Sequence, residues 1–235
     1  MTIRAVLFDL GNTLVSYYTS AEFPVVLHRC LEECASTLGL PPDNASLEDL
    51  FERAMVLNQE KPDYAVRPLR SRLEALFGAS QRLDDTSFPA LVTAFMKPIL
   101  SVARLDPQAL PVLEKLRSLG IKTAIVSNSP WGTPAGVWRE ELVRHGLLDK
   151  VDATVFCGEV GWRKPHRAPF DRALSLLNVA PSEAVFVGDH PKWDAEGARD
   201  AGLRPVLLGS EPIGDYEVIS ELRDVIALVA PAMRR

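Results

Sequence analysis

Four short, largely apolar runs along the chain each end abruptly at a polar residue or a glycine. They cover residues 5–8, 123–126, 153–156 and 184–187. The hydrophobic positions follow one another instead of alternating with polar ones, a pattern typical of strands that are buried on both faces of a parallel sheet. We therefore predict that these runs are the strands of an α/β domain.

Helical segments lie between these runs from about residue 105 onward. The segment 106–120 opens with Asp106 as an N-cap and Pro107 in the first turn, repeats apolar residues at helical spacing, and stops at Gly120. Segments 166–178 and 193–202 have the same character. Alternation of strand and helix predicts a doubly wound, Rossmann-like core built from residues 1–15 and 100–235.

Residues 16–99 have a different pattern. They contain amphipathic helical segments at 21–39, 46–61, 67–78 and 87–100, separated by breaks that contain Pro and Asp. No strand pattern lies between them. We interpret this region as an all-helical module inserted after the first strand.

Composition narrows the possible partners. The 235 residues carry a net charge of −5, which argues against a nucleic-acid-binding surface and favours a small-molecule partner. Cys30, Cys34 and Cys157 lack paired spacing, which argues against a disulfide framework or a zinc site and fits a reducing cytoplasm. No export signal or apolar run of membrane-spanning length is visible. We expect a cytoplasmic protein with neither nucleic acid nor membrane as a partner.

Polar residues follow several of the predicted strands. Asp9, Ser127 and Asp189 each stand just after an apolar run, and Lys164 stands at the start of a predicted helix. Each taken alone is explained by turn formation, helix capping or a solvated lysine. In open α/β sheets, however, residues after the strands converge at the ligand-binding edge. Two carboxylates near one lysine there indicate a divalent cation and a phosphate.

Four motifs in order carry a family resemblance: FDLGNTL at 8–14, VSNS at 126–129, GWRKPHRAPF at 161–170 and VFVGDHPKWDAEGARDAG at 185–202. The chain resembles the haloacid dehalogenase-like (HAD) hydrolase superfamily over essentially its whole length. The resemblance implies that residues 16–99 form the helical cap of the type inserted after the first strand (C1), which closes over the site and shapes the choice of substrate.

The resemblance also implies a role for each motif residue. Asp9 would attack phosphorus and form an aspartyl-phosphate that water then hydrolyses. Lys164 would neutralise both the Asp9 carboxylate and the phosphoryl oxygens. Mg²⁺ would be held by Asp9, the Gly11 carbonyl, Asp189 and Asp194. The phosphoryl group would be bound by Thr13, Ser127, Asn128 and Lys164.

The sequence departs from the family pattern at Gly11. Most phosphatases of this superfamily carry a second Asp there, which protonates the leaving group and later activates water. A positioned acid of this kind contributes about 10²–10⁴-fold in rate. The substitution leaves open a substrate whose leaving group departs unaided, an acid supplied by the cap, the substrate or a histidine such as His166 or His190, and a slow or silent relative. Some sugar phosphatases of the superfamily share this glycine.

These observations predict a Mg²⁺-dependent phosphatase acting on a small phosphorylated metabolite, as a monomer or homodimer. The alternatives are a catalytically silent phosphate-binding or regulatory protein, a phosphonate hydrolase and a haloacid dehalogenase. Dehalogenases also lack the second Asp but need no Mg²⁺, so the retained Asp189 and Asp194 favour phosphoryl transfer. Candidate cap contacts to a polar substrate are Tyr17, Tyr18, Tyr64, Arg67, Arg70 and Arg72.

Overall fold

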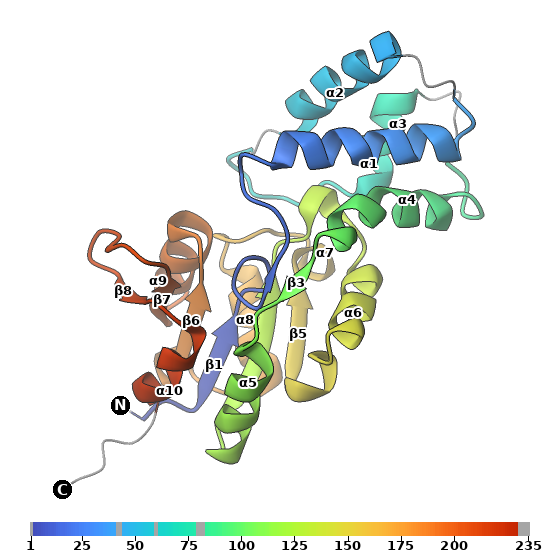
Figure 1. The fold of residues 1–235 in the computed structure, drawn as a ribbon. Coiled ribbons are helices and arrows are strands. Elements are labelled where there is room, and N and C mark those ends of the chain that lie inside the picture. Colours follow the sequence, from blue (N-terminus) through green and yellow to red (C-terminus); the bar gives the residue numbers. More distant parts are fainter. Residues whose placement is uncertain (1, 41–43, 59–60, 79–82, 230–235) are drawn as a thin grey trace, which may run out of the picture.

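A six-stranded parallel sheet forms the centre of the larger lobe (Figure 1). The computed structural model describes residues 2–40, 44–58, 61–78 and 83–229. The strands lie in the order β5 (Ala153–Phe156), β4 (Lys122–Ser127), β1 (Ala5–Phe8), β6 (Ala184–Gly188), β7 (Arg204–Leu208) and β8 (Glu217–Ile219). The doubly wound parallel sheet predicted from the continuous apolar runs is confirmed.

The register of β1 sets where its neighbours end. Phe8 pairs with Ile125 of β4 on one side and with Val187 of β6 on the other. The residues that follow these strands therefore reach the same edge of the sheet, since parallel strands end on the same side. Asp9, Ser127 and Asp189 are brought together in this way.

Helices cover both faces of the sheet. Alternate residues of β1 point to opposite faces, so Val6 and Phe8 join one buried cluster while Ala5 and Leu7 join the other. On the first face the cluster includes residues of α5 (Ala109–Ser118), α6 (Ala135–Arg144) and α10 (Val225–Val229). The opposite face is packed by α8 (Ala168–Leu177) and α9 (Gly197–Asp200). The core is a three-layer α/β/α arrangement.

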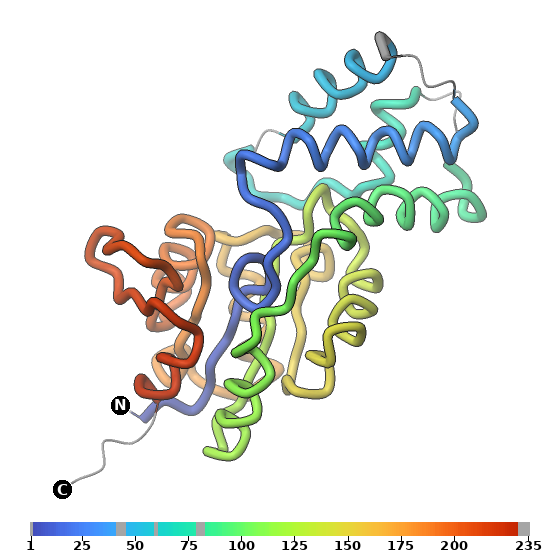
Figure 2. The backbone as a smooth tube through the Cα atoms, in the orientation of Figure 1, coloured from blue at the N-terminus to red at the C-terminus, as the bar shows by residue number. Residues whose placement is uncertain are grey.

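A separate helical lobe lies beyond the carboxyl edge of the sheet (Figure 2). It contains α1 (Phe23–Thr37), α2 (Asn44–Asn58), α3 (Leu69–Phe77) and α4 (Phe88–Ser101). The chain enters and leaves it through an antiparallel pair of short strands, β2 (Val15–Ser16) and β3 (Arg104–Leu105). In the described part of the chain, no helix combines the length and apolar character needed to cross a membrane.

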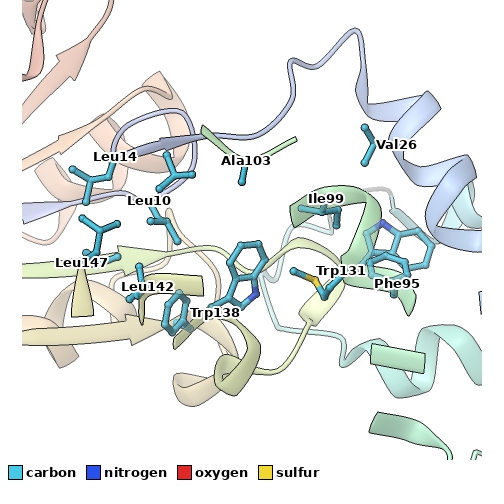
Figure 3. Packing of buried hydrophobic residues seen from close by; sticks show 14 of the residues in the cluster. Leu10, Leu14, Val26, Phe95, Ile99, Ala103, Trp131, Trp138, Leu142 and Leu147 are labelled. Atoms are coloured by element: carbon cyan, nitrogen blue, oxygen red, sulfur yellow. The ribbon is translucent and has the colours of Figure 1, made fainter. Parts of the chain in front are cut away.

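Short elements complete the connections: η1 (Pro130–Gly132), η2 (Leu148–Lys150), α7 (Cys157–Val160), η3 (Pro181–Glu183), η4 (Pro191–Glu196) and η5 (Leu222–Asp224). One buried hydrophobic cluster runs from the sheet face into the helical lobe (Figure 3). Within it Trp131 of η1 packs against Phe95 of α4, with ring centroids 5.6 Å apart. Side chains of the core and of the lobe therefore share one apolar interior.

Backbone contacts also join the helical lobe to two loops of the core. The Val66 amide donates to the Gly161 carbonyl at 2.9 Å, and the Arg163 amide donates to the Tyr64 carbonyl at 2.8 Å. On the other side, Gly132 has a φ of +67°, and a Cβ added there would lie 2.0 Å from the Arg67 carbonyl oxygen. The segment 64–67 is thus held between η1 and the loop that leads to Lys164.

We expect Gly132→Ala to lower the free energy of unfolding by about 2–4 kcal/mol, since the added Cβ is strained at positive φ and overlaps a backbone carbonyl. Urea denaturation followed by circular dichroism measures this change. Gly136→Ala is the matched control, because a Cβ at this α6 position meets nothing within 4 Å and alanine favours a helix. Equal effects of the two substitutions would contradict the close approach at Gly132.

Candidate active site at the carboxyl edge of the sheet

Lys164 lies between two carboxylates at the edge of the sheet. Its Nζ is 2.6 Å from Asp9 Oδ1 and 2.6 Å from Asp194 Oδ1. Asp9 follows β1 directly, and Asp194 lies within η4. Because the three side chains are almost fully buried, these charge-assisted bonds are shielded from water and are stronger than exposed ion pairs.

Asp189 adds a third carboxylate next to this pair. Ligand oxygens of Asp9, Asp189 and Asp194 lie within 4.8 Å of one another. Three carboxylates around one ammonium leave an excess of negative charge. A set of hard oxygen donors with this excess matches the preference of Mg²⁺.

Burial and the excess of negative charge change the protonation of these groups. Burial raises the pKa of Asp9 to about 7; Lys164 opposes the rise and the charges of Asp194 and Asp189 add to it. Burial and then Asp194 raise the pKa of Asp189 to about 6. Burial disfavours the charged form of Lys164, but Asp194 and Asp9 outweigh it and raise the lysine pKa.

The side chain of Asn128 fixes the backbone at Lys164. Its Oδ1 accepts from the Lys164 amide at 2.8 Å, and its Nδ2 donates to the Lys164 carbonyl at 3.1 Å. Asn128 follows β4, so this pair of bonds ties the lysine loop to the sheet. The family resemblance predicts phosphate binding for Asn128; its hydrogen bonds to the Lys164 backbone depend on a side-chain orientation that spacing does not reveal.

Gly188 leaves space for the carboxylate of Asp194. A Cβ at Gly188 would lie 2.4 Å from Asp194 Cγ, so no larger residue fits at the end of β6 without moving that carboxylate. The His190 amide donates to Asp194 Oδ2 at 3.0 Å and fixes the other oxygen. The only sequence signal for this role was the glycine immediately before Asp189.

A cavity of about 390 Å³ opens over these charges between the core and the helical lobe. Of the predicted site residues, its walls include Asp9, Gly11, Ser127, Asn128, Lys164, Asp189 and Asp194. Thr13 is not among the lining residues: it is buried, and its hydroxyl has no hydrogen-bond partner among the described atoms. Most of the predicted set is therefore in one place.

Gly11 has room for a larger side chain. A Cβ at this position would make an ordinary contact of 3.8 Å with the ring of Tyr17. The surrounding atoms therefore do not exclude a Cβ at this position.

The two histidines near the third and fourth motifs have different surroundings. His190 lines the cavity, and its Nδ1 accepts from the amides of Lys192 and Trp193. A nitrogen that accepts carries no proton, so a neutral His190 carries its proton on Nε2. His166 is not a lining residue; its Nδ1 accepts from the Ala168 amide, and its ring stacks on Trp162.

The candidate contacts from the inserted region are divided. Tyr17 and Tyr18 line the cavity. Tyr64, Arg67, Arg70 and Arg72 are not among the lining residues: Arg67 pairs with Asp63, Arg70 pairs with Asp85, and the Arg72 Nη1 donates to the Leu57 carbonyl.

Comparison with known proteins identifies the family. A model of the haloacid dehalogenase-like hydrolases matches residues 3–202. The chain belongs to this family. The resemblance carried by the four motifs is confirmed, and so is its class as a hydrolase.

Relatives of this HAD-like hydrolase bear the names of phosphatases. A phosphoserine phosphatase of Thermus thermophilus is 37% identical over 67% of this chain, which spans 59% of that protein's length. A ribulose-1,5-bisphosphate 5-phosphatase of Halopiger xanaduensis is 32% identical over a region that covers 86% of this chain and 83% of that protein. A glyceraldehyde 3-phosphate phosphatase of Methanopyrus kandleri is 29% identical over a region that covers 92% of this chain and 88% of that protein.

Solved structures share the fold of this HAD-like hydrolase. A 2-haloacid dehalogenase from Pseudomonas syringae has a TM-score of 0.70 at 26% identity, over 97% of this chain and 99% of that one. The putative HAD-hydrolase YfnB from Bacillus subtilis, solved with magnesium bound, has a TM-score of 0.62 at 16% identity, over 98% and 100%.

The raised pKa of Asp189 predicts a pH-dependent stability of the metal-free protein. Between pH 3.8 and about 6 the folded chain holds this proton more tightly than the unfolded chain, so unfolding releases protons and stability falls as pH rises. We expect Asp189→Asn to raise the free energy of unfolding by about 1–3 kcal/mol at pH 8 and to have little effect at pH 3.5.

Urea denaturation in the presence of a chelator measures this difference at both pH values. Asp171→Asn is the control, because this carboxylate lies outside the site and pairs with Arg167. A destabilised Asp189→Asn protein at pH 8 would contradict the excess of negative charge.

Proposed function

We propose that the chain is a Mg²⁺-dependent phosphatase that acts on a small phosphorylated metabolite. The observation that carries the proposal is the Asp9 carboxylate at the end of β1, held 2.6 Å from Lys164 and facing a cavity beside two more carboxylates. A carboxylate held next to a fixed cation is suited to approach an anionic phosphoryl group. The phosphatase names of the relatives support the same reaction class.

The donor set supports Mg²⁺ as the cofactor. Oxygens of Asp9, Asp189 and Asp194 gather within 4.8 Å, and we assign the Gly11 carbonyl as a further ligand by resemblance to the family. When bound, the metal supplies positive charge next to the phosphoryl oxygens and the attacking carboxylate.

Asp9 is the proposed nucleophile. Its carboxylate oxygen forms a bond to phosphorus while the bond from phosphorus to the leaving oxygen breaks, which gives an aspartyl-phosphate and an alkoxide. The alkoxide takes a proton from the surrounding water and departs as the alcohol, because Gly11 offers no acid. Water then hydrolyses the acyl phosphate and restores the carboxylate. Lys164 neutralises charge on Asp9 and on the phosphoryl oxygens, while Ser127 and the backbone after β4 contact the phosphoryl group.

The helical lobe is proposed to be the cap that selects the substrate. Helices α1–α4 lie between β2 and β3, and Tyr17, Tyr18 and Phe23 line the cavity together with the core residues. We assign this role to residues 16–99 as a cap of the C1 type. A cytoplasmic location is proposed from cysteine usage, and the expected oligomeric state is a monomer or a homodimer.

Two alternative functions explain fewer of the observed features of the site. Dehalogenation needs no Mg²⁺, and it gives the cluster of Asp9, Asp189 and Asp194 no cation to bind. A silent phosphate-binding protein is consistent with Gly11, but it does not need the close contact between Asp9 and Lys164. Turnover of any phosphorylated metabolite at an ordinary enzymatic rate excludes the silent reading.

We expect Asp9→Asn to lower metal-dependent phosphate release by at least about 10³-fold, because an amide does not act as the nucleophile. Phosphate release is measured from an aryl phosphate and from a panel of phosphorylated metabolites, with Mg²⁺ and with chelator. Asp171→Asn is the control carboxylate outside the site and retains the wild-type rate. An active Asp9→Asn protein, or equal wild-type rates with chelator, would overturn the proposal.

The effect of the absent acid is tested by Gly11→Asp. We expect the rate with alkyl phosphates, whose leaving groups need a proton, to rise by about 10²-fold or more. The open space at Gly11 lets the side chain enter, and Gly11→Ala controls for its bulk. An unchanged rate shows that another group already supplies the proton, and an equal gain with Ala contradicts an acid–base cause.

A further inference from the structure

Three buried nitrogen donors near the cavity have no acceptor among the described atoms. They are Nε of Arg72 on α3, Nε1 of Trp131 in η1, and Nε of Arg163 in the loop that leads to Lys164. Buried donors in folded proteins are almost always paired. Three unpaired donors from separate elements therefore point to an acceptor that the described residues do not supply.

Two of these donors belong to cations that form no ion pair with described residues. Among the described residues, the Arg72 guanidinium makes one hydrogen bond, to the Leu57 carbonyl at 2.8 Å, and it lies 5.1 Å from the centre of the Trp131 ring. Burial, followed by the charges of Arg163 and Arg67, lowers the pKa of Arg72 to about 10. The charges of Arg72 and Arg163 at this end of the cavity therefore have no counter-ion among the residues that the structure describes.

Arg163 is close to the proposed phosphoryl site. It precedes Lys164, so the two Cα atoms are separated by a single peptide, about 3.8 Å or less. Arg163 and Trp131 line the same cavity as Asp9 and Lys164. The Arg163 backbone is fixed by a hydrogen bond of 2.8 Å that its amide donates to the Tyr64 carbonyl. Arg163 and Lys164 therefore border the same cavity.

We propose that Arg163 and Trp131 bind a second anionic group of the substrate, a carboxylate or a second phosphate, while Arg72 acts behind them as a positioning residue that stacks on Trp131. This inference rests on the proposed phosphatase function and names its class of substrate. A guanidinium and an indole N–H both donate, and a planar guanidinium matches the oxygens of either anion. A substrate with a neutral end would leave the positive charge of Arg163 uncompensated.

Three compounds of equal carbon length test this subsite: propyl phosphate, 3-phosphooxypropanoate and propane-1,3-diol bisphosphate. We expect kcat/KM for at least one acidic compound to exceed that for propyl phosphate by about 10- to 100-fold. The compound preferred tells whether the second anion is a carboxylate or a phosphate. We expect Arg163→Gln to lower the ratio of kcat/KM for the preferred acidic compound to kcat/KM for propyl phosphate at least about tenfold. Trp131→Phe, which keeps an aromatic ring but loses the N–H, is expected to lower this ratio less.

Arg167→Gln is the matched control and leaves the ratio unchanged, because Arg167 is exposed and pairs with Asp171. Arg163→Lys keeps the charge, and circular dichroism checks that each variant is folded. A wild-type ratio near one, or an unchanged ratio in Arg163→Gln, would overturn the subsite. If none of the three compounds is hydrolysed, calorimetric binding of the same compounds tests the subsite, and equal affinities overturn it; the proposed phosphatase function is tested separately by the aryl phosphate and the panel of metabolites.

Discussion

The buried ammonium of Lys164 between Asp9 and Asp194 is the contact on which the rest of the site depends. Each carboxylate lies 2.6 Å from it, and charges buried this deeply are stable only when they are paired. Neighbouring residues serve this arrangement: the Asn128 amide holds the lysine backbone from both sides, and Gly188 leaves the space that Asp194 occupies. One asparagine side chain and one glycine therefore hold the groups of this buried ion pair in place.

The same arrangement leaves the site with more negative charge than one lysine neutralises. Burial and mutual repulsion raise the pKa values of Asp9 and Asp189, which means that the ionised site opposes folding. The excess also provides the attraction for a divalent cation. Stability is reduced at the point where, in the proposed function, the chemistry takes place, as is common for functional sites.

Much of this arrangement follows from the sequence, because continuous apolar runs identify parallel strands and parallel strands place Asp9, Ser127 and Asp189 at one edge. The pairing of β2 with β3 does not follow from the sequence, because each strand has only two residues and the two lie far apart in the chain. Thr13 is predicted to bind the phosphoryl group, but it is buried and is not among the residues that line the cavity. The orientation of a side chain such as Asn128 is decided by tertiary contacts that spacing does not encode.

In the proposed enzyme, the residue that binds the second anion of the substrate, Arg163, directly precedes Lys164, which pairs with the nucleophile. Lys164 is held by Asn128 of the core, whereas the amide of Arg163 is bonded to Tyr64 of the helical lobe. Gly132 is pressed against the Arg67 carbonyl from the opposite side, so the lobe contacts both loops that border the cavity. Through Tyr64 the lobe therefore contacts the residue proposed to select the substrate, whereas Lys164 is bonded to Asn128 of the core and the proposed nucleophile directly follows strand β1.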